Sequence, residues 1–571
     1  MRSILLATAA VALTMTAAQA QPATQALRTA DFLNSVGVNL HLNSQWDTSY
    51  SDAANGGTGA GSGVTTVNGY TTNVSKIAAA LNYAGLTRVR VGMSAPYVLS
   101  RFQALALASP WLRADVQVDT GPAISDQLAR AAQVPDRIDS FEGMNEGTDR
   151  TDYYNGQNAA PADCAFQRDL RVGVTAWNKT YQPARFVPLL APSVADWNGF
   201  GQLAGCASSS DASNGHSYVD ATPPTASKAY DLPHEQQDAP AGAPNYVTET
   251  GPITNALTSR GMSEDYAARR TLDLLLAFKK TTVRTYLYEL VDERAHNPVL
   301  NDGSSDEQEM HYGLFHSDWT AKASAVALHN QAAILLDHAA TAGTFAPGSL
   351  AYAISGAAPA TYSLLMQKAD GTFILALWAE PNTWNAATSN SAGWASTPTP
   401  TTVTVSFPAM SAIGASDAFG MAATLPAGTN AKVVITDHPV YLSLTVAPPV
   451  PVTPPTPVTP PPVTPPPVTP PPVTPPAPVA TSANGTTITG ATGSIGDAHG
   501  DAFTLVAAPG LGNQIAMNGK VDGATSSVVT LEWLNGNLFQ VNTAGNGWVK
   551  VAGAGAWTAV SADVVGLCLK H

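Results

Sequence analysis

Short hydrophobic runs recur along residues 30–335 and alternate with amphipathic stretches. Apolar residues take helical spacing in 75–84 and, more strongly, in 266–279. Alternating strands and helices are typical of a parallel sheet covered by helices. The β-rich runs are eight in number, at 36–42, 87–91, 114–118, 138–144, 185–190, 214–219, 245–248 and 283–288. This count predicts the α/β fold of a (β/α)₈ TIM barrel over residues 21–338.

A doubly wound parallel sheet is the main alternative to the barrel. Its nucleotide-binding versions carry a GxGxxG after the first strand or a GxxxxGK[ST] loop. The chain has neither motif at such a position. The barrel is therefore the preferred prediction.

The remaining chain divides into three segments. Residues 339–447 hold short alternating runs split by turns, which predicts an antiparallel β-sandwich that part of 21–35 can join. Residues 448–479 repeat Pro, Thr and Val and predict an extended linker of roughly 95 Å. Residues 480–571 predict a small β-rich module. Its aromatic residues either bind carbohydrate or a cell surface, or form a core: Trp533, Phe539, Trp548 and Trp557.

The N-terminus has the three parts of a secretory signal peptide. Arg2 precedes an apolar stretch at 4–18, and Ala18-Gln19-Ala20 is a cleavage site of the small-x-small type. We therefore expect residues 1–20 to be removed and the protein to be secreted or periplasmic, with attachment to the cell surface left open. In an oxidising compartment Cys164 and Cys206 are candidates for a disulfide, although the sequence does not fix the pairing. The third cysteine, Cys568, would then have no cysteine of the same chain to pair with.

Net charge and hydropathy restrict the classes of molecule that the protein can bind. The chain has 28 Lys and Arg against 42 Asp and Glu, a net charge of −14. This balance argues against nucleic acid or an anionic membrane as a partner. No stretch after the signal peptide is long and apolar enough to span a bilayer. A monomer is the default expectation.

Two glutamates follow predicted strands at their carboxyl ends. Glu146 follows the fourth run, in IDSFEGMNEG, and Glu249 ends the seventh, in NYVTETG. Active sites of TIM barrels form at this end of the strands. Glycoside hydrolysis needs one protonated and one ionised carboxyl group, so two facing glutamates fit that chemistry.

With Asn145-Glu146 after strand four and Glu249 at strand seven, the chain resembles the retaining glycoside hydrolases of the large (β/α)₈ clan that includes cellulases, β-xylosidases, β-glucuronidases and glucosylceramidases. The resemblance covers about residues 30–447. It implies Glu146 as acid/base and Glu249 as nucleophile. It also implies a β-linked oligo- or polysaccharide substrate and no cofactor.

The resemblance implies roles for further residues. Asn145 would bind the sugar 2-hydroxyl, and His216 or Tyr218, in the sequence GHSY, would orient the nucleophile. The other positions expected to face substrate or nucleophile are Arg90, His41, Tyr288 and Glu289. The stretch 311–330 also resembles the clan. The chain departs from the clan pattern at Gly147, where many members have Pro, and in lacking a Trp after strand eight.

Three alternatives stay open on sequence. Glu289 is the substitute nucleophile should Glu249 not take that role. His216 as a metal ligand lacks an HExxH-like partner spacing, so we expect no metal site. The whole chain can also be a glycan-binding scaffold without catalysis, or a transglycosylase that uses the same glutamate pair.

Overall fold

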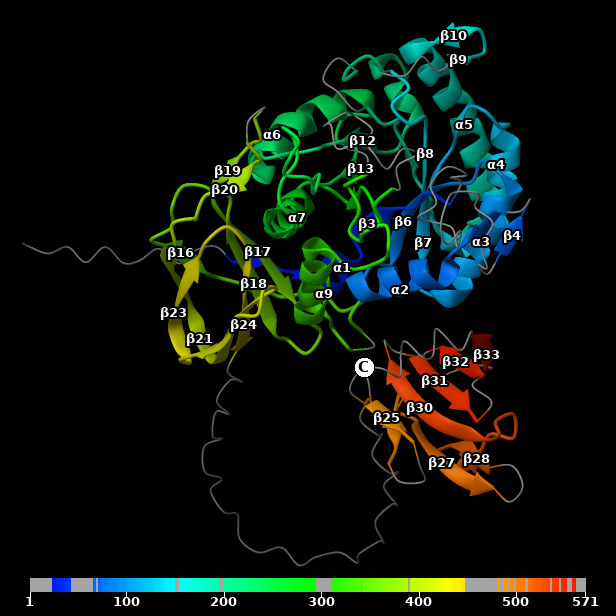
Figure 1. Ribbon diagram of the computed structural model, residues 1–571, viewed down its shortest axis with the longest axis vertical. Helices are drawn as coiled ribbons and strands as arrows, with labels where there is room; N and C mark the ends of the chain where they lie inside the picture. Colours follow the sequence, from blue (N-terminus) through cyan, green and yellow to red (C-terminus); the bar gives the residue numbers. More distant parts are fainter. Residues whose placement is uncertain are drawn as a thin grey trace, which may run out of the picture.

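The computed structural model describes residues 23–42, 65–67, 70–148, 153–194, 199–293, 310–339, 341–388 and 391–446, with shorter stretches of 481–560. The expected signal peptide, the proline-rich linker and Cys568 lie outside the described residues. The described chain forms an α/β barrel, a β-sandwich and a small β-rich module (Figure 1). No described helix is long and apolar enough to cross a membrane.

Eight parallel strands form the barrel. Their order is β11-β8-β7-β6-β3-β14-β13-β12, and a parallel bridge between Leu190 and Ala212 completes the circle. Most strand residues are buried, as expected for a sheet that is covered by helices outside and filled by side chains inside. The strands are β3 (Val36–Asn39), β6 (Arg88–Gly92), β7 (Arg113–Gln117), β8 (Ile138–Glu142), β11 (Leu189–Leu190), β12 (Ser213–His216), β13 (Asn245–Thr250) and β14 (Arg284–Leu287).

All eight strands fall on the predicted runs, but several end earlier than predicted. β3 ends at Asn39 instead of residue 42, and β8 ends at Glu142 instead of residue 144. The run at 185–190 is reduced to Leu189–Leu190, because Pro188 has no amide hydrogen to donate to a neighbouring strand. Residues 40–42, 143–144 and 217–219 therefore lie just beyond the strands, whereas Glu249 stays within β13.

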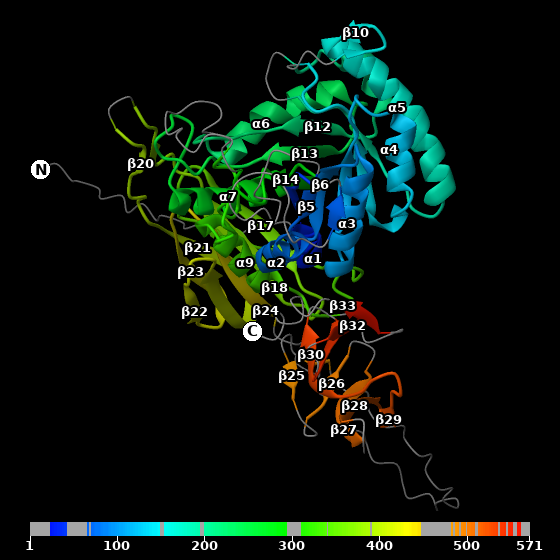
Figure 2. The same ribbon diagram turned by 45° about the vertical axis from the view of Figure 1, so that its right-hand side comes forward.

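Helices surround the barrel (Figures 1 and 2). Helix α7 illustrates the local signals: the side chain of Ser263 caps its first turn, which carries Glu264 and Asp265, and Lys279 lies in its last turn. The helices are α1 (Thr29–Leu33), α2 (Val74–Ala84), α3 (Pro96–Ala108), α4 (Ile124–Ala131), α5 (Ala159–Tyr181), α6 (Pro224–Glu235), α7 (Glu264–Lys279) and α9 (Ala323–Leu335). Short elements between them are β4 (Thr65–Val67), β5 (Tyr70–Thr72), η2 (Pro135–Arg137), β9 (Tyr153–Tyr154), β10 (Gln157–Asn158), η3 (Ala204–Ser209) and η4 (Gln236–Asp238).

The β-sandwich follows α9 and encloses its own apolar core. Its longest strand, β21, pairs with β16 and β23 through its first half and with β24 and β22 through its second half. The N-terminal strands β1 (Thr24–Gln25) and β2 (Leu27–Arg28) pair with β15 and β17, so residues before the barrel do join the sandwich. The other strands are β15 (Ser349–Leu350), β16 (Ala353–Ser355), β17 (Thr361–Gln367), β18 (Phe373–Ala379), β19 (Trp384–Asn385), β20 (Trp394–Ala395), β21 (Thr401–Asp417), β22 (Ala422–Leu425), β23 (Gly428–Ile435) and β24 (Val440–Val446).

Polar contacts attach the sandwich to the barrel. The carboxylate of Glu380, which follows β18, accepts hydrogen bonds from the backbone N–H and the hydroxyl of Thr225 at the start of α6. The side chain of Gln331 on α9 donates to the Tyr441 hydroxyl at 2.6 Å. Because Glu380 is buried and lies at a helix N-terminus, its charge stabilises this junction.

The C-terminal module has two antiparallel sheets, ordered β25-β30-β31-β32-β33 and β26-β27-β28-β29. Trp533 and Phe539 are buried, whereas Trp548 and Trp557 are only half-buried. The aromatic residues are therefore divided between core and surface. The strands are β25 (Thr486–Ile488), β26 (Ile495–Gly496), β27 (Ala502–Ala508), β28 (Gly512–Met517), β29 (Lys520–Val521), β30 (Val528–Leu534), β31 (Asn537–Asn542), β32 (Gly547–Val551) and β33 (Thr558–Val560).

Candidate active site

The two sequence-predicted glutamates meet at the carboxyl end of the barrel. Glu146 lies four residues after β8, and Glu249 is the last residue but one of β13. One carboxylate oxygen of each, and a ring nitrogen of His216 on β12, all lie within 4.8 Å of one another. Both glutamate side chains keep some exposure, 15% for Glu146 and 10% for Glu249, so both remain open to solvent or a ligand.

The backbone holds Glu146 in an unusual conformation. Its φ of +51° lies in the left-handed region, which costs a residue other than glycine about 1 kcal/mol or more. The Glu146 N–H donates to the carbonyl oxygen and the hydroxyl of Ser193, each at 3.2 Å, and Asn145 forms a bridge with the same residue. These contacts fix the carboxyl group, whose Oε1 lies 2.6 Å from Nδ1 of His216.

Glu249 is surrounded by hydrogen-bond donors. Arg90 donates from Nη1 to Oε1 at 2.5 Å, and the Tyr218 hydroxyl donates to Oε2 at 2.8 Å. Burial, followed by the charge of Glu249, raises the pKa of Tyr218 well above its ordinary value, so the hydroxyl keeps its proton. Donors on both oxygens fix the orientation of the Glu249 carboxyl group.

A buried ionic network below the site positions Arg90. Its Nε and Nη2 donate to both oxygens of Glu142, at 2.6 and 2.9 Å. Burial opposes the charge of Arg90, but the carboxylates of Glu142 and Glu249 raise its pKa well above the ordinary value. Burial also opposes the charge of Glu142, and Arg90 outweighs it, so the pKa of Glu142 is lowered. Glu142 is thus a buried carboxylate that is paired with Arg90.

Asp115 completes this network from β7. Burial, and then the nearby charge of Glu142, raise the pKa of Asp115 well above its ordinary value. Asp115 also accepts a hydrogen bond from the Ser140 hydroxyl. A raised pKa favours the neutral, protonated form of Asp115. A neutral Asp115 beside the Glu142 carboxylate avoids repulsion between two buried negative charges.

Asn145 and Gly147 flank Glu146 with different roles. The Asn145 Oδ1 accepts from Nη2 of Arg90 at 2.6 Å, so Arg90 connects both sides of the site. A Cβ atom at Gly147 would lie 2.0 Å from Oδ1 of Asp163, a fully buried side chain of α5. Close packing against α5 therefore leaves room only for glycine at this position.

His41, Tyr288 and Glu289 lie together on a second side of the site. Nδ1 of His41 is 3.3 Å from Glu289 and 3.2 Å from Glu293, and its ring centroid is 5.4 Å from that of Tyr288. Glu289 is fully buried. It is grouped with His41 and Glu293, whereas Glu249 is the glutamate grouped with Glu146.

Sequence reasoning missed two members of the site. Tyr312 lies with its ring centroid 5.5 Å from that of Tyr218 and 5.4 Å from that of Tyr288, which links the two sides. Tyr312 belongs to the stretch 311–330, which resembles the glycoside hydrolase clan in sequence. That resemblance was the one signal in the sequence that pointed to Tyr312. Glu293 lies in the loop after β14 and carried no signal, because its partner His41 comes from the opposite end of the barrel sequence.

Two triads of the site have spacing that suits a cation, contrary to the expectation that His216 lacks partners. They are His41, Glu289 and Glu293, and Glu146, His216 and Glu249. In the second triad, Arg90 and Tyr218 already donate to Glu249 and would compete with a cation. The sequence search for a local motif could not detect either triad, since the members come from separate strands and loops.

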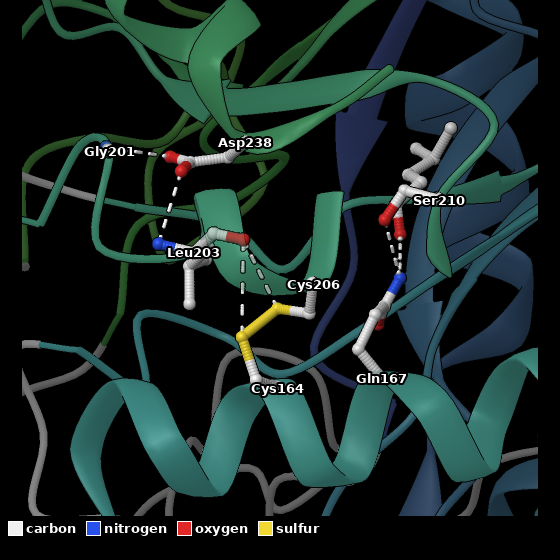
Figure 3. Close-up of a disulfide and its surroundings, with 8 residues drawn as sticks. Cys164, Gln167, Gly201, Leu203, Cys206, Ser210 and Asp238 are labelled. Carbon is white, nitrogen blue, oxygen red and sulfur yellow. Dashed lines mark hydrogen bonds between the residues drawn. A yellow bond between two sulfur atoms is a disulfide. The ribbon is translucent and has the colours of Figure 1, made fainter. Parts of the chain in front are cut away.

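The disulfide lies beside the barrel, on the α5 side (Figure 3). It joins Cys164 on α5 to Cys206 on η3, the pair expected from the sequence. Close by, the Asp238 carboxylate accepts from the backbone N–H groups of Gly201 and Leu203. Burial raises the pKa of Asp238 to about 6, against the effect of these donors. The disulfide and these hydrogen bonds fasten residues 199–209, which lie between β11 and β12.

No family model matches the chain, and no curated protein matches its sequence. Solved structures similar to it include a family 39 glycoside hydrolase from Bacteroides cellulosilyticus WH2, with 13% identity over 73% of this chain and 82% of the other and a TM-score of 0.46. A glucosidase from Croceicoccus marinus has 10% identity over 65% and 92% of the two chains, with a TM-score of 0.40. An exo-β-1,4-mannosidase from an Opitutaceae bacterium has 14% identity over 52% and 59%, with a TM-score of 0.35. Similarity this distant leaves the function to be argued from the site itself.

Proposed function

We propose that the protein is a glycoside hydrolase that cleaves β-linked glycans with retention of configuration. The observation that carries the proposal is the approach of Glu146 and Glu249, whose oxygens lie within 4.8 Å at the carboxyl end of the barrel. Retaining enzymes separate their carboxyl groups by about 5–5.5 Å, whereas inverting enzymes need about 6.5–9.5 Å to admit a water molecule. The shorter spacing supports double displacement.

The environments of the two carboxyl groups support distinct roles. Glu249, with donors on both oxygens, is the nucleophile and bonds to the anomeric carbon as the glycosidic C–O bond breaks. Glu146 gives its proton to the departing oxygen. Water then transfers a proton to Glu146 while its oxygen attacks the anomeric carbon, which releases Glu249 and the sugar.

The neighbouring residues act as positioning and binding groups in this proposal. Arg90 and Tyr218 orient Glu249, and His216 orients Glu146 through the contact at 2.6 Å. Arg90 donates a hydrogen bond to the side-chain oxygen Oδ1 of Asn145. This contact leaves the side-chain NH2 group of Asn145 to donate to the sugar 2-hydroxyl. On the second side of the site, the polar group around His41 binds the other hydroxyls.

We further propose that the protein is exported and acts on a polymeric glycan. The signal-peptide pattern at 1–20 and the proline-rich stretch at 448–479 support this. A module tethered by an extended linker raises the local concentration of enzyme at an insoluble or surface-bound substrate. The half-buried Trp548 and Trp557 are the candidates for contacts with such a surface.

The test is hydrolysis of a panel of aryl β-glycosides, with the anomer formed first identified by proton NMR. Retention supports the proposal, and first formation of the α-anomer contradicts double displacement. Glu249→Ala should abolish hydrolysis, and azide should restore cleavage and give an α-glycosyl azide. Glu264→Gln is the control, because Glu264 is 36% exposed on α7 and belongs neither to the proposed pair nor to the group around His41. A wild-type protein that binds glycan but releases no product would support the scaffold alternative.

A further inference from the structure

A second hollow lies outside the site described above, between α4 and α5. Its volume is about 480 Å³, within the range of small-molecule sites. The two helices run side by side in both ribbon views (Figures 1 and 2). Its walls come from the loop after β7, from α4, from α5 and from β9. The residues that line it include Thr120, Pro122, Ile124, Tyr154, Asp169 and Val172.

The walls of this hollow are held by specific contacts. The buried Gln127 side chain accepts from the Asp119 N–H and donates to the carbonyl oxygens of Asp119 and Pro122, which fixes the loop after β7. Gly173 lets α5 approach α4, since a Cβ there would lie 2.6 Å from Leu128. The hollow is thus a built feature and not a gap between mobile loops.

The lining combines apolar surface with one aromatic ring and one carboxylate. The Tyr154 ring packs edge-on against Phe166, at 5.1 Å between centroids, and its hydroxyl donates to Oδ2 of Asp169 at 2.8 Å. Val172 is 71% exposed, so its side chain adds apolar surface that a ligand can reach. No lining residue is a cation, so the surface suits a neutral ligand with an apolar face and hydroxyl donors.

The hollow also lies on the same face of the barrel as the glutamate pair. Thr120 follows β7, and Tyr154 lies in the segment between β8 and α5, eight residues after Glu146. A chain of eight residues spans at most roughly 28 Å, so one extended glycan can contact both places.

We propose that this hollow is a secondary binding site for a neutral pyranose unit of the glycan whose cleavage is proposed above. Tyr154 and the apolar wall contact the sugar ring, and Asp169 accepts from its hydroxyls. A contact added outside the catalytic cleft raises affinity for long chains and leaves small substrates unaffected. The proposal depends on the proposed function for the identity of the ligand, but not for the existence of the site.

The test measures binding of neutral hexasaccharides of β-1,3-glucan, β-1,4-glucan, xylan and mannan to the full chain carrying Glu249→Gln. Val172→Trp fills the hollow from an exposed position and should not disturb folding. In the chain with Glu249→Gln, we expect Val172→Trp to weaken binding of the preferred hexasaccharide about five-fold. In the chain that keeps Glu249, it should raise KM for the polymer similarly. Hydrolysis of an aryl β-glycoside should be unchanged. Tyr154→Ala should act in the same direction.

Tyr153→Ala is the matched control, because Tyr153 is the adjacent tyrosine, is 68% exposed and does not line the hollow. The proposal is overturned if Val172→Trp leaves hexasaccharide affinity and polymer KM within two-fold of the parent, or if Tyr153→Ala weakens both equally. Should wild type cleave no glycoside, the proposed function fails. Loss of hexasaccharide binding on filling the hollow would still support the site.

Discussion

Replacing Arg90 by methionine tests the ionic network below the glutamates. Arg90 is 6% exposed and donates hydrogen bonds to Glu142, Glu249, Asn39 and Asn145. Removing one partner of a buried ion pair costs about 3–5 kcal/mol, because the other charge remains buried without compensation. We therefore expect Arg90→Met to lower the free energy of unfolding at pH 7 by about that amount and to abolish hydrolysis.

The pH dependence separates this electrostatic effect from lost packing. The pKa of Glu142 is lower in the folded protein than its ordinary value of 4.5. Ionised Glu142 therefore stabilises the folded protein above pH 4.5, and this stabilisation is lost as the pH falls through the pKa of the folded state. The deficit of Arg90→Met should therefore shrink as the pH falls below 4.5. Urea denaturation of both proteins between pH 3 and 7 measures it.

A matched control is Arg260→Met, since Arg260 is 45% exposed and its Nε lies 3.1 Å from Asp220, which is 36% exposed. An exposed pair of this kind contributes about 0–1 kcal/mol. The reasoning is refuted if Arg90→Met costs less than 1 kcal/mol at pH 7, or if its cost is the same at pH 3 and pH 7.

Three other substitutions test separate parts of the structure. Tyr218→Phe removes a donor to the nucleophile and should lower kcat/KM about 10- to 100-fold while melting at nearly the wild-type temperature. Gly147→Ala forces a Cβ against buried Asp163 and should cost about 1–3 kcal/mol in thermal unfolding, whereas Gly205→Ala, with nothing within 4 Å, should be neutral. Burial raises the pKa of Asp238 to about 6, so its stabilising contribution is complete below pH 4 and is lost as the pH rises through 6. From pH 4 to pH 7, wild type should therefore lose about 2–3 kcal/mol of stability relative to Asp238→Asn, and equal pH profiles would contradict this.

Much of the barrel could be predicted because each strand is a short buried run. The same periodicity placed Glu146 and Glu249 after strands four and seven, and parallel strands bring such positions to one face. Exact strand ends could not be predicted, because they depend on local details such as the missing amide of Pro188. The amphipathic stretch at 266–279 coincides with most of α7, whose caps are local in sequence.

The parts of the site that escaped prediction depend on contacts between distant segments. His41 and Glu293 meet across the closure of the barrel, 252 residues apart in sequence. Likewise, the hollow between α4 and α5 depends on how closely two helices pack at Gly173. Hydrophobic periodicity reports which face of an element is buried, but it does not report which loop side chains from other elements lie opposite.

The central claim is that Glu249 bonds to the anomeric carbon. The most direct measurement is to incubate the wild-type protein with an activated 2-deoxy-2-fluoro-β-glycoside of the preferred sugar and to locate the label by peptide mass spectrometry. The account predicts one glycosyl group per chain, on the peptide that contains Glu249, and no label in Glu249→Gln. A label on Glu289, or inactivation without any covalent adduct, would contradict it.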